Sequence, residues 1–194
     1  MYMFYINQLD YPHIPYNHNM AHGGPPEGRT SVKTSGCGLC CSCMVVAHQT
    51  GKMLPIAEFV KLSEENLANQ ELGTDMKVLG PVLAKLFDLE YVQSSDKDEL
   101  IAWLKDGGEA IVHAQGDKDG HIGVFSNRGH YILATAMVGD EVQIMDPSDK
   151  PEKYEIEGRK GLVRKEEPFI YAAPEVVDEA CYADRIHFHM FKKK

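Results

Sequence analysis

Hydrophobic residues in the first half of the chain recur at every third or fourth position, the spacing that places them on one face of a helix. Stripes of leucine, methionine and aromatic residues at this spacing are typical of helix faces in a protein core, so they predict packing and no chemistry. Four helices are expected here. They are residues 37–53 with Gly51 as the stop, residues 56–66 after Pro55, residues 75–87, and a short helix with Leu100, Ile101 and Leu104 that is capped by Ser94 or Ser95.

The pattern changes after Gly107 and Gly108, where short segments rich in β-branched residues are separated by Gly, Asp, Asn and Pro. Such segments predict antiparallel strands joined by turns. Residues 175–194 are expected to form a helix followed by an edge strand. The other predicted strands are residues 109–114, 121–125, 130–138, 141–146 and 169–173.

Helices first and strands afterwards favour an α+β domain, in which the helices pack on one side of an antiparallel sheet. A length of 194 residues suits one domain. We therefore expect a single domain over residues 1–194. Its expected parts are an irregular N-terminal segment (1–36), a helical lobe (37–106), an antiparallel sheet (107–175) and a C-terminal tail (176–194).

The composition is that of an ordinary globular protein, with 43% hydrophobic and 25% charged residues. A net charge of −9 argues against a nucleic-acid partner and favours cationic or neutral substrates through steering. No apolar run reaches the roughly 18 residues that a membrane span needs, and the first residues lack the features of a signal peptide. We expect no membrane partner and a cytoplasmic location, with secretion or the cell surface as the alternative. The oligomeric state stays open.

Four of the five cysteines, Cys37, Cys40, Cys41 and Cys43, lie within seven residues, and Cys181 is far away. This clustering is not the disulfide framework of a small secreted domain, so we expect mainly reduced thiols. Zinc and iron–sulfur sites need thiolates that converge on one ion, usually from two separate pairs. The cluster is expected instead to pack one helix, since free cysteine is among the most buried residue types.

Cys37 lies between two glycines at the predicted start of a helix. A free thiol has a pKa of about 8.5, and the unpaired N–H groups and dipole of a helix N-terminus stabilise its thiolate. The flanking glycines let a substrate approach closely, which makes Gly36 and Gly38 candidate substrate-binding residues. We predict that Cys37 is a nucleophile, with a packed and inert cysteine as the alternative.

A thiolate nucleophile needs a proton partner, and the strand region offers one. His130 stands at the first position of an apolar strand, where its ring can lie in a cleft. Asp146 ends the next strand, where a carboxylate can hold the imidazole in one tautomer. His113 and His121 are the next candidates for the base.

The spacing of the histidine and the aspartate sets a geometric condition. A two-residue loop at 139–140 makes the simplest hairpin, in which Asp146 pairs with Leu133 and points to the opposite face from His130. A triad therefore requires a connection of odd length, a bulge, or an aspartate that leaves the ladder. Pro147 favours the last option because it cannot donate to a ladder.

A cysteine at a helix start, then a histidine at a strand start and an aspartate in the next turn is the arrangement of papain-like cysteine peptidases. Several segments carry a closer resemblance to one family. They are Gln8-Leu9-Asp10-Tyr11-Pro12, Ser35-Gly36-Cys37-Gly38, Gly123 to His130, and Gly129-His130-Tyr131-Ile132 with Asp146-Pro147. With them the chain resembles the bacteriocin-processing, double-glycine leader peptidases, and more closely the stand-alone relatives of that family.

The resemblance implies a papain-like fold and a cysteine peptidase that acts on a peptide or protein through a triad, without a metal or organic cofactor. By motif, the nucleophile, base and orienting carboxylate fall on Cys37, His130 and Asp146, and an oxyanion-hole amide falls on Gln8. Gly129 joins the substrate-binding residues. Asn7, Asn17 and Asn19 are alternative amides. No transporter or leader-docking domain is expected within the 194 residues.

Two other function classes stay open. Cys37 and Cys40 form a C-x-x-C at a helix start, which is also typical of thiol–disulfide redox proteins. A catalytically inactive peptide-binding module on the same fold is the second, because function depends on the site and not on the fold. The remaining histidines carry no prediction of catalysis: His187 and His189 form an H-x-H without further ligands, and His13, His18 and His22 are expected in a surface loop.

Overall fold

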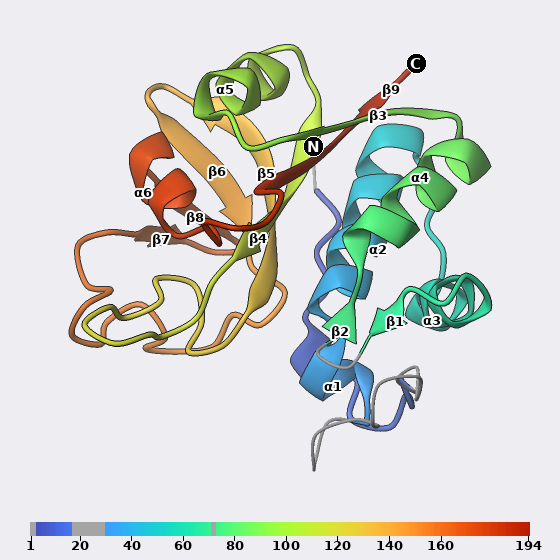
Figure 1. Ribbon diagram of the computed structural model, residues 1–194, viewed down its shortest axis with the longest axis horizontal. Helices are drawn as coiled ribbons and strands as arrows, with labels where there is room; N and C mark the ends of the chain where they lie inside the picture. The colour runs from blue at the N-terminus through green and yellow to red at the C-terminus, as the bar shows by residue number, and fades with distance from the viewer. Residues whose placement is uncertain (1–2, 17–29, 71–72) are drawn as a thin grey trace.

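The computed structural model describes residues 3–16, 30–70 and 73–194, and Figure 1 shows how their elements are arranged. The helices are η1 (Gln8–Asp10), α1 (Val32–Ser35), α2 (Cys37–Thr50), α3 (Ile56–Glu65), α4 (Met76–Phe87), α5 (Lys97–Lys105) and α6 (Pro174–Glu179). The strands are β1 (Asn69–Gln70), β2 (Gly73–Thr74), β3 (Leu89–Ser94), β4 (Glu109–Ala114), β5 (His130–Val138), β6 (Glu141–Met145), β7 (Arg164–Glu166), β8 (Phe169–Ala172) and β9 (Phe188–Lys193).

Most of the strands belong to one large sheet. Its order is β3-β9-β4-β5-β6-β8-β7, and each neighbouring pair is antiparallel. Helices α1 to α4 form a lobe beside this sheet, and α2 packs directly on β5 (Figure 1). The predicted α+β class, with an N-terminal helical lobe packed against an antiparallel sheet, is therefore confirmed.

The sheet is covered on both faces, and the sequence of β5 explains why. Tyr131 and Leu133 belong to the core on the α2 side, whereas Ile132 and Ala134 belong to a second core with α5 and α6. Side chains alternate across a strand, so four consecutive apolar residues need cover on both sides. The expectation that all helices lie on one side of the sheet is wrong, because α5 and α6 cover the opposite face (Figure 1).

The predicted helix boundaries hold where a stop or a cap is written in the sequence. Gly51 ends α2 in the left-handed conformation at φ 73°, which a residue without a Cβ adopts without strain. Pro55 precedes α3 as predicted. The cap of α5 is Asp96 and not Ser94 or Ser95, because the Asp96 carboxylate accepts hydrogen bonds from the two N–H groups of the first turn.

Two strand predictions need correction, and two strands of the large sheet were not predicted. Residues 121–125 form a loop, in which the Gly123 N–H bonds to the Asp117 side chain instead of a neighbouring strand. Strand β9 is not at an edge, since it lies between β3 and β4, where Phe188 and Met190 enter one core and Phe191 the other. Strands β3 and β7 form without a clear alternating pattern, and β3 lies inside the expected helical lobe.

Helix α2, which begins at Cys37, is the most deeply buried helix beside the sheet. Its residues from Gly38 to Ala47 are all buried, so the helix is enclosed by the sheet and by α3 and α4. Near its C-terminal end, His48 Nδ1 bonds to Glu109 Oε1 of β4 at 2.8 Å, and Nε2 bonds to the Phe4 carbonyl at 2.7 Å. These contacts tie the C-terminal end of α2 to β4 and to the N-terminal segment.

Candidate active site

Cys37 is the first residue of α2, and its side chain is only partly buried. Backbone N–H groups of Gly38 and Tyr131 donate toward its sulfur. The unpaired N–H groups and the dipole of the helix N-terminus favour a negative charge at the same place. The sequence therefore folds locally into a setting that stabilises a thiolate.

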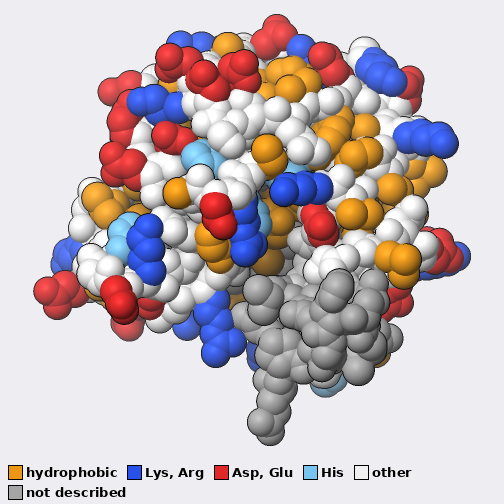
Figure 2. All heavy atoms as spheres, viewed as in Figure 1, with side chains coloured by type: hydrophobic (Ala, Val, Ile, Leu, Met, Phe, Trp, Pro, Cys, Tyr) orange, Lys and Arg blue, Asp and Glu red, His pale blue; other side chains and the backbone are white. Residues whose placement is uncertain are grey.

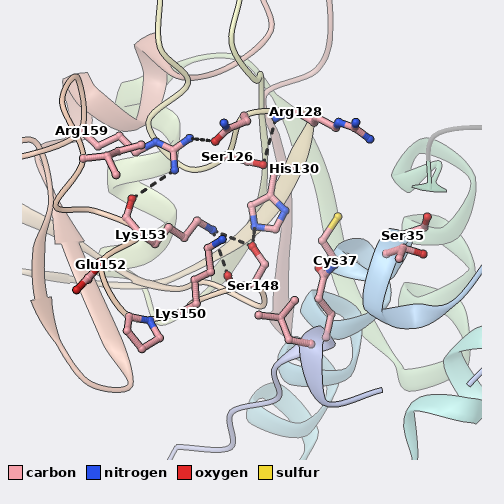
Figure 3. A pocket seen from close by; sticks show the side chains of 17 residues that line it. Ser35, Cys37, Ser126, Arg128, His130, Ser148, Lys150, Glu152, Lys153 and Arg159 are labelled. Carbon is pink, nitrogen blue, oxygen red and sulfur yellow. Dashed lines mark hydrogen bonds between the residues drawn. The ribbon is translucent and has the colours of Figure 1, made fainter. Parts of the chain in front are cut away.

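His130, the first residue of β5, lies directly opposite. Figure 3 shows the Cys37 sulfur beside the His130 ring, and the imidazole lowers the pKa of the thiol while the thiol raises the pKa of the imidazole. The imidazole Nε2 lies 2.8 Å from Asp146 Oδ1 and 3.0 Å from Ser148 Oγ. Since Nε2 is engaged by these oxygens, Nδ1 is the nitrogen available to the thiol.

A β-bulge brings Asp146 to the same face as His130. The hairpin has the expected two-residue turn, but the register shifts between Ala134 and Ala136, so that Thr135 is the extra residue. As a result Leu133 pairs with Met145 and not with Asp146. A triad required one of three alternative features. The structure has the bulge, and Asp146 also lies beyond the end of β6 at Met145.

Asp146 is fully surrounded by donors. Its Oδ2 accepts from the Lys153 ammonium and, at 2.5 Å, from the Tyr154 hydroxyl, while the Ser148 N–H donates to Oδ1 at 2.9 Å. The Tyr5 hydroxyl donates to the Asp146 carbonyl at 2.7 Å. Sequence reasoning missed Lys153, Tyr154 and Ser148, and a lysine in a polar segment after Pro147 carries no signal that it will be buried.

The pKa values of Cys37, His130 and Asp146 all shift in the directions that favour their charged forms. Burial raises the pKa of the Cys37 thiol, but the interactions with His130 and the two N–H donors outweigh it and leave that pKa below its ordinary value. Burial lowers the pKa of His130, and attraction and hydrogen bonding from Asp146 raise it above the ordinary value. Burial raises the pKa of Asp146, yet Lys153 and His130 together hold it well below its usual range. These signs are those of a thiolate–imidazolium pair beside an ionised carboxylate.

Gln8, on η1, reaches the same site from the N-terminal segment. Its N–H donates to the Pro147 carbonyl at 2.7 Å, and its Nε2 donates to the Lys33 carbonyl at 2.7 Å. One of the two Nε2 hydrogens is thus used, and the side chain is 7% exposed at the cavity wall. Asn7, an alternative amide, caps η1 and bonds to the Asp149 carbonyl instead; Asn17 and Asn19 lie outside the described residues.

A cavity of about 580 Å³ opens between the lobes at this point. It is lined by Gln8, Leu9, Thr34, Ser35, Cys37, Ser126, Asn127, Arg128, Gly129, His130, Ser148, Lys150, Pro151, Glu152, Lys153, Ile156 and Arg159. Gly129 is therefore in the wall, whereas Gly36 and Gly38 are not among its lining residues. A Cβ at Gly36 would lie 2.5 Å from the Val32 carbonyl oxygen, so this glycine is needed for close backbone packing.

The other candidate histidines lie away from the cavity wall. His113 stacks on Tyr131 at 4.4 Å between ring centroids, and burial lowers its pKa to about 3. His121 is not among the lining residues, and His13 is exposed. His187 pairs with Asp178 at 3.0 Å, and His189 hydrogen-bonds to Tyr91 at 2.8 Å. His18 and His22 lie outside the described residues.

The remaining cysteines are buried and unbridged, and burial raises the pKa of each: Cys40, Cys41, Cys43 and Cys181. Within the described ranges no group of three or more His, Cys, Asp or Glu side chains is arranged to hold a metal ion. In the same ranges, no helix has both the length and the apolar character needed to cross a bilayer.

Comparisons with known proteins were made at three levels. No family model matches the chain, and no curated protein is significantly similar in sequence. A solved structure of a protein described as a C39-like peptidase from Bacillus anthracis superposes with a TM-score of 0.60, at 14% identity, over 99% of this chain and 95% of that one. The peptidase domain of Streptococcus ComA, a bifunctional ABC transporter, superposes with a TM-score of 0.53, at 17% identity, over 81% of this chain and 91% of that one.

The chain has the papain-like fold of these C39 peptidases. The resemblance first indicated by short motifs thus extends to the three-dimensional arrangement.

Proposed function

We propose that the protein is a cysteine peptidase that cleaves a peptide or related amide bond. The observation that carries the proposal is the placement of Cys37 beside His130, which is in turn bonded to Asp146 at 2.8 Å. A thiol at a helix start with a lowered pKa, next to an imidazole with a raised pKa, is an activated nucleophile with its proton donor. The fold shared with C39 peptidases supports this reading.

The proposed reaction is acyl transfer through a thioester. The Cys37 thiolate attacks the carbonyl carbon, and the His130 imidazolium gives its proton to the leaving amine as the C–N bond breaks. Water then attacks the thioester, with His130 as the base, and the thiolate and carboxylic acid are released. Asp146 keeps the imidazole oriented and stabilises its charged form. An amine in place of water would make the same apparatus a transferase.

Gln8 is proposed to stabilise the tetrahedral oxyanion together with the Cys37 N–H. An oxyanion hole needs donors aimed at the place where negative charge develops. Gln8 Nε2 keeps a hydrogen that its bond to Lys33 does not use, and its side chain lies in the cavity wall with Cys37. Its anchor on Pro147 ties this donor to the turn that carries Asp146.

A redox function is less well supported by the surroundings of Cys40. That thiol is fully buried, and burial raises its pKa well above the ordinary value. A dithiol oxidoreductase needs a second thiol that can reach and attack a mixed disulfide. The chemistry proposed here uses only Cys37, its neighbours and water.

The proposal is tested by incubating the protein with a mixture of synthetic peptides and following new termini by mass spectrometry. We expect cleavage by the wild-type chain and by Cys40→Ser, which replaces a neighbouring thiol of the same helix, and a loss of at least about 1,000-fold in Cys37→Ser. Equal cleavage by Cys37→Ser and the wild type, or disulfide reductase activity that depends on both thiols, would contradict it.

A further inference from the structure

The wall of the catalytic cavity has a charge opposite to that of the whole chain. The sequence holds 20 basic and 29 acidic residues, yet four of the five Lys, Arg, Asp and Glu residues in the wall are cations. The cations are Arg128, Lys150, Lys153 and Arg159, and the anion is Glu152. Five charged residues drawn at random from this chain would be about two cations and three anions.

Arg159 is the most informative of the four because it is buried, with 3% of its surface exposed. Its guanidinium donates only to neutral oxygens: the Gly123 carbonyl at 2.8 Å, the Asn127 side chain at 2.5 Å and the Lys153 carbonyl at 3.4 Å. No carboxylate of the described residues forms an ion pair with it. A buried charge without a counter-ion projects its field into the nearest polar space, which here is the cavity.

Arg128 and Lys150 add exposed positive charge at the rim. Both side chains are exposed, and neither forms an ion pair with a carboxylate in the described part of the chain. Figure 3 shows the Arg128 guanidinium extending past His130. Lys153 differs from these two, since its charge is balanced by Asp146.

Resting on the proposed function, we infer that the site takes acidic substrates, in which a carboxylate close to the scissile bond binds the surface formed by Arg128, Lys150 and Arg159. A guanidinium and an ammonium at the rim can each bond directly to the carboxylate, while the buried Arg159 contributes its field. Local potential in a cleft governs approach to the thiolate more than net charge does, because exposed charges farther away are screened within about 10 Å. The carboxylate is either an Asp or Glu side chain or the free C-terminus of the peptide.

The inference can be tested without knowing the natural substrate, by comparing two alkylating probes of Cys37. Iodoacetate carries a carboxylate and iodoacetamide is neutral, so the ratio of their rates reports the potential at the thiolate. We expect this ratio to fall roughly 5-fold or more in the double variant Arg128→Gln/Lys150→Gln, and added salt to lower the ratio in the wild type only. Iodoacetamide labelling itself should change little.

Two matched variants control for the change in total charge. Lys85→Gln/Lys105→Gln removes two exposed charges that do not line the cavity, and the ratio should stay at the wild-type value. Glu152→Gln removes the single wall anion and should raise the ratio.

Peptides distinguish the two sources of the carboxylate. The test uses a pool of peptides in which every C-terminus is amidated. If an Asp or Glu side chain is recognised, the peptides are still cleaved and acidic residues are found beside the cleaved bonds. If the free C-terminus is recognised, the amidated peptides are not cleaved. Cleavage without either preference overturns the inference, as does an iodoacetate ratio that is equal in the wild type and the rim double variant. If iodoacetamide labelled Cys37 slowly and no faster than the other four cysteines, the proposed peptidase itself would be contradicted. The acidic-substrate inference would then fall with it.

Discussion

At the scale of residues, the carboxylate of Asp146 binds His130 with one oxygen and a lysine and a tyrosine with the other. His130 bonds to one oxygen, and Lys153 with Tyr154 bonds to the other. Asp146 raises the pKa of His130, while the positive charge of Lys153 lowers it. Lys153 is therefore a positioning residue that fixes the carboxylate and moderates how strongly the imidazole holds its proton.

Replacing Lys153 by methionine tests this role. Without the ammonium the pKa of His130 should rise, so the imidazolium persists to higher pH and the basic limb of the kcat/KM profile moves upward. We also expect kcat/KM at the optimum to fall about 10-fold, because the carboxylate loses an anchor. The measurement is the pH profile of peptide cleavage.

Lys160→Met is the matched control, because Lys160 lies in the same segment but its side chain is exposed. Its ammonium pairs weakly with the exposed Glu155 carboxylate, at 3.8 Å. Its basic limb should stay at the wild-type position. A lower rate in Lys153→Met with an unshifted basic limb would show that Lys153 supports the fold alone.

How far single residues can be predicted depends on whether their role is local. Cys37, His130 and Asp146 come together as expected, because each stands at the end of an element that the sequence marks. Lys153 and Arg159 could not be found, since a buried cation in a polar loop depends on partners that only the folded chain brings near.

At the scale of elements, the bulge in β5 reconciles two demands on one hairpin. The turn at 139–140 sets the pairing of Val138 with Glu141, while the core sets the pairing of Leu133 with Met145. These two registers differ by one residue, and Thr135 absorbs the difference. The position of Asp146 relative to His130 thus depends on the register of the strand ends.

One-residue deletions on the two sides of the hairpin should have opposite outcomes. Deleting Thr135 removes the extra residue and leaves Leu133 opposite Met145, so Asp146 keeps its place and kcat/KM should stay within about 10-fold of the wild type. Deleting Gln143 shortens β6 and draws Asp146 away from His130, with an expected loss above about 100-fold. Circular dichroism checks that both variants fold. Equal losses in the two, or a failure of the Thr135 deletion to fold, would contradict this role of the bulge.

Elements were predictable where local chemistry sets their ends, and not where long-range pairing does. Gly51 and Pro55 mark helix boundaries by their backbone preferences alone. Strand β9 could not be placed from the sequence, because its neighbours β3 and β4 come from distant parts of the chain. The loop at 121–125 has the composition of a strand, but the Gly123 N–H bonds to the Asp117 side chain instead of to a neighbouring strand.

At the scale of the whole molecule, the site exists only because the lobes are joined. Cys37 belongs to the helical lobe and His130 to the sheet, and α2 packs on β5 to bring them together. The −9 net charge of the chain and the cationic cavity wall show that overall composition does not give the local environment of a site. Motif order predicted that Cys37, His130 and Asp146 lie together across both lobes, whereas the charge of the wall could be seen only in the fold.

The most direct measurement is the pH dependence of Cys37 alkylation by iodoacetamide, read by mass spectrometry, in the wild type and in His130→Ala. His130 lowers the pKa of the thiol, so the wild-type rate should remain high well below pH 8. In His130→Ala only burial and the N–H donors remain, and labelling at pH 6 should be about 100-fold slower, as for a thiol with a pKa of about 8.5 or above. Two identical profiles, both following an ordinary thiol, would contradict the claim that the imidazole holds Cys37 as a thiolate.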